Sequence, residues 1–132
     1  LRELHELGTE VGIAFQMQDD LLDVVADPDK FGKQRGGDIL EGKKTYLSIL
    51  SLQHGSTEQK AFLEEIFQKA DASEEEVEEV IALYQSLGVI DQTSAAVKEH
   101  YKRAVSHLDN LSTSPYKDDL AGFLTMLINR EY

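Results

Sequence analysis

The residues of this sequence best suited to chemistry are carboxylates that recur along one predicted helix near the N-terminus. Together with one glutamine they fall at i, i+3, i+4, i+7 and i+11, which places the side chains on one narrow helical face: Gln16, Asp19, Asp20, Asp23 and Asp27. Carboxylates one turn apart repel, and on a largely apolar helix they cost several times more free energy unless something neutralises them. Oxygen ligands without nearby Cys or His favour Mg²⁺, which commonly binds one or two protein carboxylates and completes its shell with water and phosphate oxygens. We therefore expect Mg²⁺ on this face.

The alternative interpretation is that this acidic stripe is the solvent face of an amphipathic helix. Such a face usually mixes lysine with glutamate, whereas this one holds only aspartate and glutamine, and aspartate is a poor helix former away from caps. Gly8 and Gly12 continue the face upstream, where missing side chains would let another backbone or a ligand tail approach closely. Helix packing alone could also explain these glycines. The residue types of the stripe favour metal binding.

A basic segment follows the aspartates. Five of the thirteen basic residues lie within fifteen positions: Lys30, Lys33, Arg35, Lys43 and Lys44. The formal net charge of -12 repels nucleic acid and argues against a general polyanion binder. Carboxylates beside a local basic patch suit a metal-bridged phosphate ligand better than a bare anion or cation.

The spacing of apolar residues is helical nearly throughout, with no convincing period-two strand, so we expect an all-α fold. Six helices are predicted: residues 1 to about 26, about 44–53, from 57, from 74 to 87, about 90–111, and from 115. Ser56 with Gln59 and Ser73 with Glu76 form capping boxes. Six aromatic side chains stand at core spacings: Tyr46, Phe62, Phe67, Tyr84, Tyr101 and Phe123.

Several classes of site and location are disfavoured. The chain has no cysteine, which excludes thiolate zinc sites and Fe–S clusters. No apolar run is long enough to span a membrane and no signal peptide is visible, so a cytoplasmic location is the default expectation. The four histidines show no ligand spacing tied to the aspartates, and we expect surface or packing roles for them: His5, His54, His100 and His107.

Four ordered blocks give the sequence a family resemblance. They are Gly12-Ile13-Ala14-Phe15-Gln16 running into Asp19-Asp20-Leu21-Leu22-Asp23, then Gly32-Lys33, Gly37-Asp38-Ile39 and Gly42-Lys43-Lys44-Thr45. This set resembles the second aspartate-rich motif and the following loop of the trans-isoprenyl diphosphate synthases, or polyprenyl synthetases. The specific blocks occupy residues 8–45; beyond them the likeness is helical periodicity.

The resemblance implies that residues 1–132 form the C-terminal helices of the isoprenoid synthase fold. The second aspartate-rich motif would be residues 15–23 and the lysine-bearing loop residues 30–45, followed by amphipathic helices. The implied activity is a Mg²⁺-dependent condensation of an allylic diphosphate with isopentenyl diphosphate, which lengthens an isoprenoid chain.

The same resemblance implies roles for individual residues. Asp19 and Asp23 would bind Mg²⁺ on the allylic diphosphate, with Asp20 beside them as a ligand or support. Lys33 and Lys43 would grip that diphosphate, and lysine suits the task as a compact, mobile charge.

Other side chains of the motif have different expected roles. Phe15 and Gln16 would line the site beside the allyl group. For Lys44, Lys30 and Arg35 we expect solvated loop charges. Asp38 would orient the loop or cap the following helix.

The family's first aspartate-rich motif is not in this sequence. Asp118-Asp119 cannot replace it, because the positions of its closing carboxylate hold Gly122 and Leu124. We therefore expect a C-terminal part of a longer enzyme, inactive by itself. Apolar residues such as Val11 and Leu22 would then be left at the surface, and a homodimer would cover them.

Two alternatives remain. A class I terpene cyclase is one, since Asp19, Asp23 and Asp27 repeat the four-residue spacing of that group's second metal motif. Carboxylates at all three positions, together with the Gly-Lys-Lys-Thr block, argue against it. The other is a non-catalytic partner subunit of a prenyl synthase, which an intact second motif disfavours.

Overall fold

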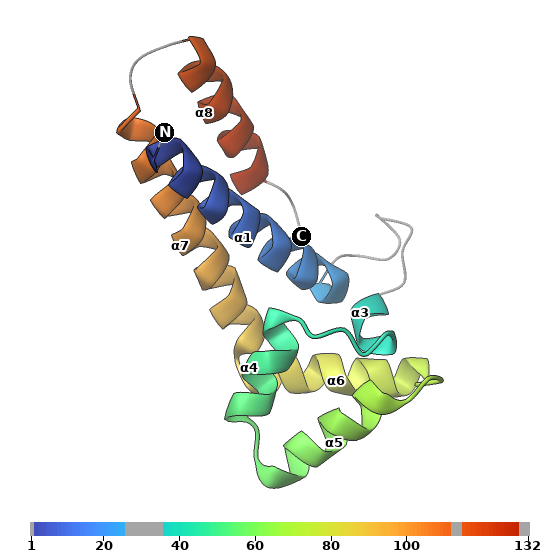
Figure 1. Ribbon diagram of the computed structural model, residues 1–132. Helices are drawn as coiled ribbons and strands as arrows, with labels where there is room; N and C mark the ends of the chain where they lie inside the picture. The colour runs from blue at the N-terminus through green and yellow to red at the C-terminus, as the bar shows by residue number, and fades with distance from the viewer. Residues whose placement is uncertain (1, 26–35, 112–114, 130–132) are drawn as a thin grey trace. The chain divides into compact units, whose positions relative to one another are not determined.

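The computed structural model describes residues 2–25, 36–111 and 115–129, without the side chains of residues 115 and 116. In these residues it has seven helices and no strand (Figure 1): α1 (Arg2–Val25), α3 (Gly37–Leu40), α4 (Tyr46–His54), α5 (Thr57–Gln68), α6 (Glu74–Ser86), α7 (Val89–Asp109) and α8 (Pro115–Ile128). The all-α prediction is confirmed, and the six expected helices are all present. The short helix α3 was not predicted, because four residues are too few to show a helical period.

Within the described residues, three helices begin with a capping box. At α5 the Ser56 hydroxyl accepts from the Gln59 N–H at 3.2 Å, and the Ser56 N–H donates to the Gln59 side chain at 2.8 Å. Ser73 and Glu76 make the same pair at α6. Both boxes confirm the prediction. The third joins Thr45 to Ser48 at α4; it was missed because serine replaces the Glu or Gln expected at that position.

The described residues divide into two compact units. Unit 1 takes in residues 2–18, 94–111 and 115–129, and unit 2 takes in residues 19–25 and 36–93. Each unit has its own hydrophobic core. The core of unit 1 contains Leu7, Ala14, Met17, Val97, Tyr101, Ala104, Leu108, Leu124 and Leu127. The core of unit 2 contains Leu21, Val24, Ile39, Leu47, Leu63, Ile66, Val77, Val80, Ile81, Tyr84 and Val89.

Inside unit 1, a buried polar contact joins three helices. Gln18 of α1 is 1% exposed; its side-chain oxygen accepts from the Tyr101 hydroxyl at 3.0 Å, and its amide nitrogen donates to the Leu127 carbonyl at 3.3 Å. The helical period identifies Gln18 only as a polar residue beside the core. Its partners lie 83 and 109 residues away. The contact satisfies polar groups that would otherwise be costly to bury.

The predicted aromatic core is partly wrong. Tyr84 and Tyr101 are buried, and Phe62 and Phe67 pack at the edge of the unit 2 core. Tyr46 and Phe123 are instead exposed, at 37% and 49%. Phe123 immediately precedes the buried Leu124, and neighbouring residues point about 100° apart around a helix.

Two further expectations concern the surface. Val11 and Leu22, which we expected at the surface, are half-buried; Val11 packs against the unit 1 core. Among the described residues, no helix is both long and apolar enough to cross a bilayer.

Candidate functional site

The last turns of α1 carry the aspartates of the candidate site in unit 2. Leu21 and Val24 are buried in the core and anchor this end of the helix. The three aspartates differ in exposure: Asp19 is exposed, Asp23 is half-buried and Asp20 is only 5% exposed. The side chains therefore share one end of α1 but have different environments.

Asp23 holds the start of α3. Its Oδ2 atom accepts from the Asp38 backbone N–H at 3.0 Å, and its backbone carbonyl accepts from the Gly36 N–H at 2.8 Å. Gly36 is the N-cap of α3 and has no side chain to cap it. The Asp23 carboxylate supplies the missing acceptor from a different helix.

Glycine is required where α3 begins. Gly36 has a φ of +79°, and a Cβ atom there would lie 2.3 Å from the Val77 Cγ1 atom of α6. Because L side chains rarely adopt this backbone conformation and the space is filled, the chain can turn toward α1 only with glycine at this position.

A second glycine turn at the end of α3 brings Lys43 to the aspartates. Gly42 has a φ of +66°, and the following Lys43 N–H donates to the Asp38 carbonyl at 2.9 Å. The Lys43 ammonium then lies 3.4 Å from Asp20 Oδ1 and 3.9 Å from Asp38 Oδ2. We call Asp20, Asp23, Asp38 and Lys43 the aspartate–lysine cluster.

This cluster carries more negative than positive charge. Burial raises the pKa of Asp23, although backbone hydrogen bonds from Asp38 and Gly37 oppose the rise. Burial and the Asp23 charge raise the pKa of Asp38 to about 6. Asp38 and Asp20 in turn raise the pKa of Lys43. Burial and the mutual repulsion of the carboxylates make this cluster costly to ionise, so a bound cation would lower the free energy of its ionised form.

A small cavity opens beside the cluster. It is lined by Asp20, Val24, Asp38, Ile39, Lys43, Thr45, Leu47 and Tyr84. Tyr84 is one of the lining residues, and burial first, and then the Asp23 and Asp38 charges, raise the pKa of Tyr84. The polar lining includes two carboxylates, one ammonium group and two hydroxyl-bearing residues. Carboxylate oxygens can ligate a hard cation, and an ammonium group can bind phosphate.

Other predicted site residues are not part of this cluster. Lys33 lies outside the described residues, as do Lys30, Arg35 and Asp27. Phe15 and Gln16 are exposed residues on the part of α1 that belongs to unit 1. Lys44 is exposed, as expected for a solvated loop charge.

The role expected for Asp38 needs correction in one respect. It does not cap the following helix, because Thr45 does so. Its ion pair with Lys43 and its backbone contacts place it in the cluster as a loop-orienting residue. The neighbouring glycines at positions 36, 37 and 42 are the sequence signal for this turn.

Several known proteins have sequences similar to that of this chain. The polyprenyl synthetase family model matches residues 1–84. A short chain isoprenyl diphosphate synthase of Methanothermobacter thermautotrophicus is 33% identical over 98% of this chain and 39% of its own length. An octaprenyl diphosphate synthase of Haemophilus influenzae is 30% identical over 99% of this chain and 40% of its own length. The chain thus spans about two fifths of the length of these relatives.

Solved structures show the same helical arrangement. A geranylgeranyl pyrophosphate synthetase from Pyrococcus horikoshii has a TM-score of 0.86 and 31% identity over 98% of this chain and 39% of its own. A geranylgeranyl pyrophosphate synthase from Corynebacterium glutamicum, complexed with isoprenyl diphosphate and magnesium, has a TM-score of 0.86 and 28% identity. The match covers 98% of this chain and 37% of that structure's chain. The match to the family model and the similarity to solved structures show that this chain belongs to the polyprenyl synthetase family and has its all-α isoprenoid synthase fold.

Proposed function

We propose that this chain supplies the second metal–diphosphate half-site of a Mg²⁺-dependent trans-prenyltransferase. The reaction would join an allylic diphosphate to isopentenyl diphosphate. The observation that carries the proposal is that Lys43 pairs with Asp20 and Asp38, while the Asp23 carboxylate accepts from the Asp38 backbone N–H. These groups meet at the end of the helix that also bears the exposed Asp19. The names of the relatives and the magnesium and isoprenyl diphosphate in the Corynebacterium glutamicum structure support it.

The residues fit Mg²⁺ on chemical grounds. All the ligating atoms of the cluster are carboxylate oxygens, which Mg²⁺ prefers. Burial raises the pKa of both Asp23 and Asp38, and a bound cation would favour their ionised forms. Asp19 and Asp23 are the proposed ligands, with Asp20 as a further ligand or support. When bound, the ion would stabilise the negative charge that develops on the departing diphosphate.

In this proposal Lys43 changes partners when substrate binds. Its ammonium now neutralises Asp20 and Asp38, and its side chain is 42% exposed. A cation at the aspartates would take over that neutralisation and leave Lys43 to grip the phosphate oxygens, together with Lys33. Phe15 and Gln16 would lie beside the allyl group. Departure of the diphosphate allows the allylic carbon to alkylate the double bond of isopentenyl diphosphate, and a proton is then lost.

The test uses the full-length parent protein. Asp19→Ala should reduce condensation by orders of magnitude, because it removes a charge that positions the metal at the leaving group. Asp38→Asn should reduce it less. Circular dichroism controls for folding, and a radiolabelled condensation assay measures turnover. Full activity in Asp19→Ala would exclude the assignment, whereas a folded parent protein without any turnover would favour a non-catalytic partner subunit.

The isolated 132-residue chain should be helical, inactive and dimeric. It carries one of the two metal motifs of the family, which is why we expect no turnover. Unit 1 also exposes large apolar side chains, which favour association: Leu4, Ile13, Phe15, Val105, Phe123, Met126 and Ile128. Sedimentation tests the homodimer, and a monomer would contradict it.

A further inference from the structure

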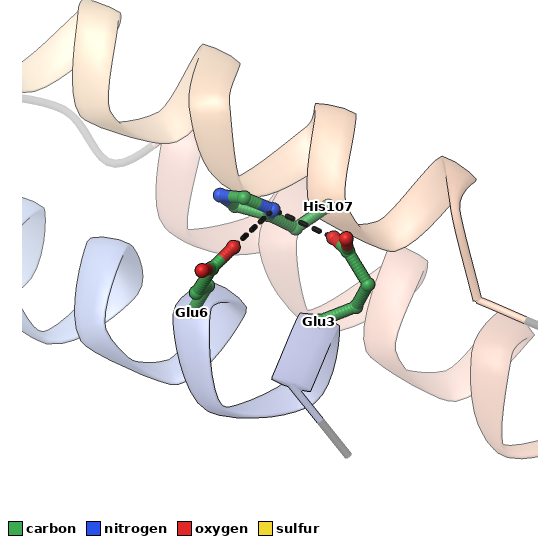
Figure 2. A group of neighbouring side chains, drawn as sticks. All are labelled: Glu3, Glu6 and His107. Atoms are coloured by element: carbon green, nitrogen blue, oxygen red, sulfur yellow. Dashed lines mark hydrogen bonds and ion pairs between the residues drawn. The ribbon is translucent and has the colours of Figure 1, made fainter.

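Unit 1 contains a second group of side chains that can ligate a metal. Figure 2 shows Glu3 and Glu6 on the first turns of α1, both directed toward His107 of α7. One ligating atom from each residue lies within 4.8 Å of the other two. His107 Nδ1 is 2.8 Å from Glu3 Oε2 and 3.3 Å from Glu6 Oε2. We call these residues the glutamate–histidine cluster.

The core of unit 1 holds the backbone beneath this cluster. Leu7 follows Glu6 and is 3% exposed, while Leu108 follows His107 and is 5% exposed. Both belong to the same core cluster, so the facing turns of α1 and α7 are packed against one another. The spacing of Glu3 and Glu6 at i and i+3 places their side chains on one face. The three ligating groups therefore come from a packed framework.

More carboxylates lie near His107 Nδ1 than one hydrogen bond can use. A single imidazole nitrogen carries at most one hydrogen, yet two carboxylates face Nδ1 of His107. A contact elsewhere in unit 1 shows the simpler arrangement, in which His100 Nδ1 meets one carboxylate, that of Glu10, at 2.5 Å. A group that accepts three ligands at once, such as a metal ion, accounts for the geometry at His107 more fully than one proton does.

Neighbouring residues orient the two glutamates. Arg2 binds Oε1 of Glu6 at 3.3 Å, which leaves Oε2 toward His107. The Oε2 atom of Glu3 also lies toward His107, at 2.8 Å from Nδ1.

We propose that Glu3, Glu6 and His107 bind a divalent transition-metal ion, with Zn²⁺ the best fit. Zinc accepts a mixed imidazole and carboxylate set at about 2.0–2.2 Å, which sets ligand atoms about 3.4 Å apart in a tetrahedron. The distances of 2.8 and 3.3 Å from Nδ1 need only a small expansion. Water completes the tetrahedron, since all three residues are partly exposed. The ion ties the start of α1 to the end of α7.

This site differs in chemistry from the aspartate–lysine cluster and does not rest on the proposed prenyltransferase activity. Imidazole suits Zn²⁺, Co²⁺ and Ni²⁺, whereas oxygen-only ligands suit Mg²⁺. The two clusters should therefore select different ions from a mixture.

The test titrates Zn²⁺ into the tag-free, chelator-stripped 132-residue chain and follows heat by calorimetry. We expect one ion per chain in the presence of excess Mg²⁺. His107→Gln and Glu6→Gln should each weaken the affinity at least tenfold. His100→Gln is the matched control, because it removes a histidine from the same helix that faces one glutamate, and it should leave the affinity unchanged. Asp19→Ala should also leave it unchanged.

Two further measurements separate ligation from folding. Co²⁺ bound to the wild-type chain should give a visible absorption band typical of imidazole ligation, which His107→Gln abolishes while keeping its helical circular dichroism. Zn²⁺ should raise the melting temperature of the wild-type chain but not that of His107→Gln. No Zn²⁺ binding, equal binding by His107→Gln, or loss of binding in Asp19→Ala would each overturn the proposal.

Discussion

The two units of this chain each gather carboxylates around a nitrogen, but the two clusters have opposite electrostatics. In unit 2, burial raises the pKa of both Asp23 and Asp38 around the single ammonium of Lys43. In unit 1, a hydrogen bond from His107 lowers the pKa of Glu3. In the first cluster burial makes the carboxylates costly to ionise, whereas in the second a hydrogen bond favours the ionised form of Glu3.

This difference separates two uses of acidic side chains. Crowded, partly buried carboxylates lower the stability of the unit that contains them when they are ionised, and such groups are often found at functional sites. Carboxylates paired with imidazole connect two helices and stabilise the unit with or without an ion. If both proposals hold, the cluster in unit 2 would bind a hard cation with a phosphate, and the cluster in unit 1 would bind a softer ion that reinforces two helices.

The largest effect should come from the turn that delivers Lys43. In Gly42→Ala the new Cβ would lie 2.3 Å from the Phe67 backbone oxygen, and the φ of +66° is strained for alanine. We expect a loss of about 3 kcal/mol in the free energy of unfolding, measured with denaturant. Gly88→Ala is the control, since its φ of +75° is similar but nothing lies within 4 Å. It should cost about 1 kcal/mol. Equal losses would mean that the contact with Phe67 is unimportant.

The next effect concerns Lys43 itself. In the full-length parent, Lys43→Ala should weaken binding of a non-hydrolysable allylic diphosphate analogue about a hundredfold, or about 2.7 kcal/mol. Binding of an isopentenyl diphosphate analogue should change little. Lys44→Ala is the matched control: Lys44 is exposed next in sequence, and its replacement should change neither affinity more than about twofold. Calorimetry measures both ligands. A selective loss for the isopentenyl analogue would assign Lys43 to the other substrate.

These predictions rest on a turn that the sequence could reveal only in part. The six longer helices were predictable because caps and periodicity are local, as the Ser56 and Ser73 boxes show. Helix α3 was not, because it has only four residues and its cap comes from Asp23 on another helix. A local pattern cannot show a partner that tertiary structure supplies.

The candidate site, like the fold, could be predicted from the sequence only in part. The period of α1 places Asp19, Asp20 and Asp23 together, but adjacent residues point about 100° apart, so Asp20 is buried while Asp19 is exposed. The approach of Asp38 and Lys43 depends on the positive φ angles of Gly36 and Gly42. The sequence contains these glycines but does not show the direction in which they turn the chain.

A smaller effect should distinguish the clusters by pH. The Asp38 pKa of about 6 lies above its ordinary value of 3.8, so the folded chain binds this proton more tightly than the unfolded chain. The contribution of the protonated Asp38 carboxyl to the stability of the fold is therefore full below pH 3.8 and is lost as the pH rises through 6. Allowing for solvent screening, Asp38→Asn should gain about 1 kcal/mol at neutral pH and lose this advantage by pH 4 in metal-free buffer.

Replacing Glu3 should change the stability of the chain in the opposite direction in the same experiment. Since its pKa is lowered, its stabilising contribution is present above the ordinary value of 4.5 and is lost as the pH falls through the folded-state pKa. Glu3→Gln should therefore destabilise the chain at neutral pH and converge with the wild type in acid. Denaturant unfolding at several pH values measures both variants. If both variants changed the stability in the same direction at neutral pH, the contrast between the two clusters would be wrong.

The smallest effect tests the glycines that precede the aspartates. Gly12 lies inside α1 in unit 1, and a Cβ atom there would meet nothing within 4 Å. Gly12→Ala should therefore stabilise the isolated chain by about 0.5 kcal/mol, because alanine favours the helix and restricts the unfolded chain. This is opposite in sign to Gly42→Ala in unit 2. Thermal unfolding measures the change, with Gly122→Ala of α8, equally open, as the control. If Gly12→Ala alone destabilised the chain, a second copy would have to pack against α1 at this point. If it stabilised the isolated chain but slowed condensation in the full-length parent, the open face would serve the substrate tail.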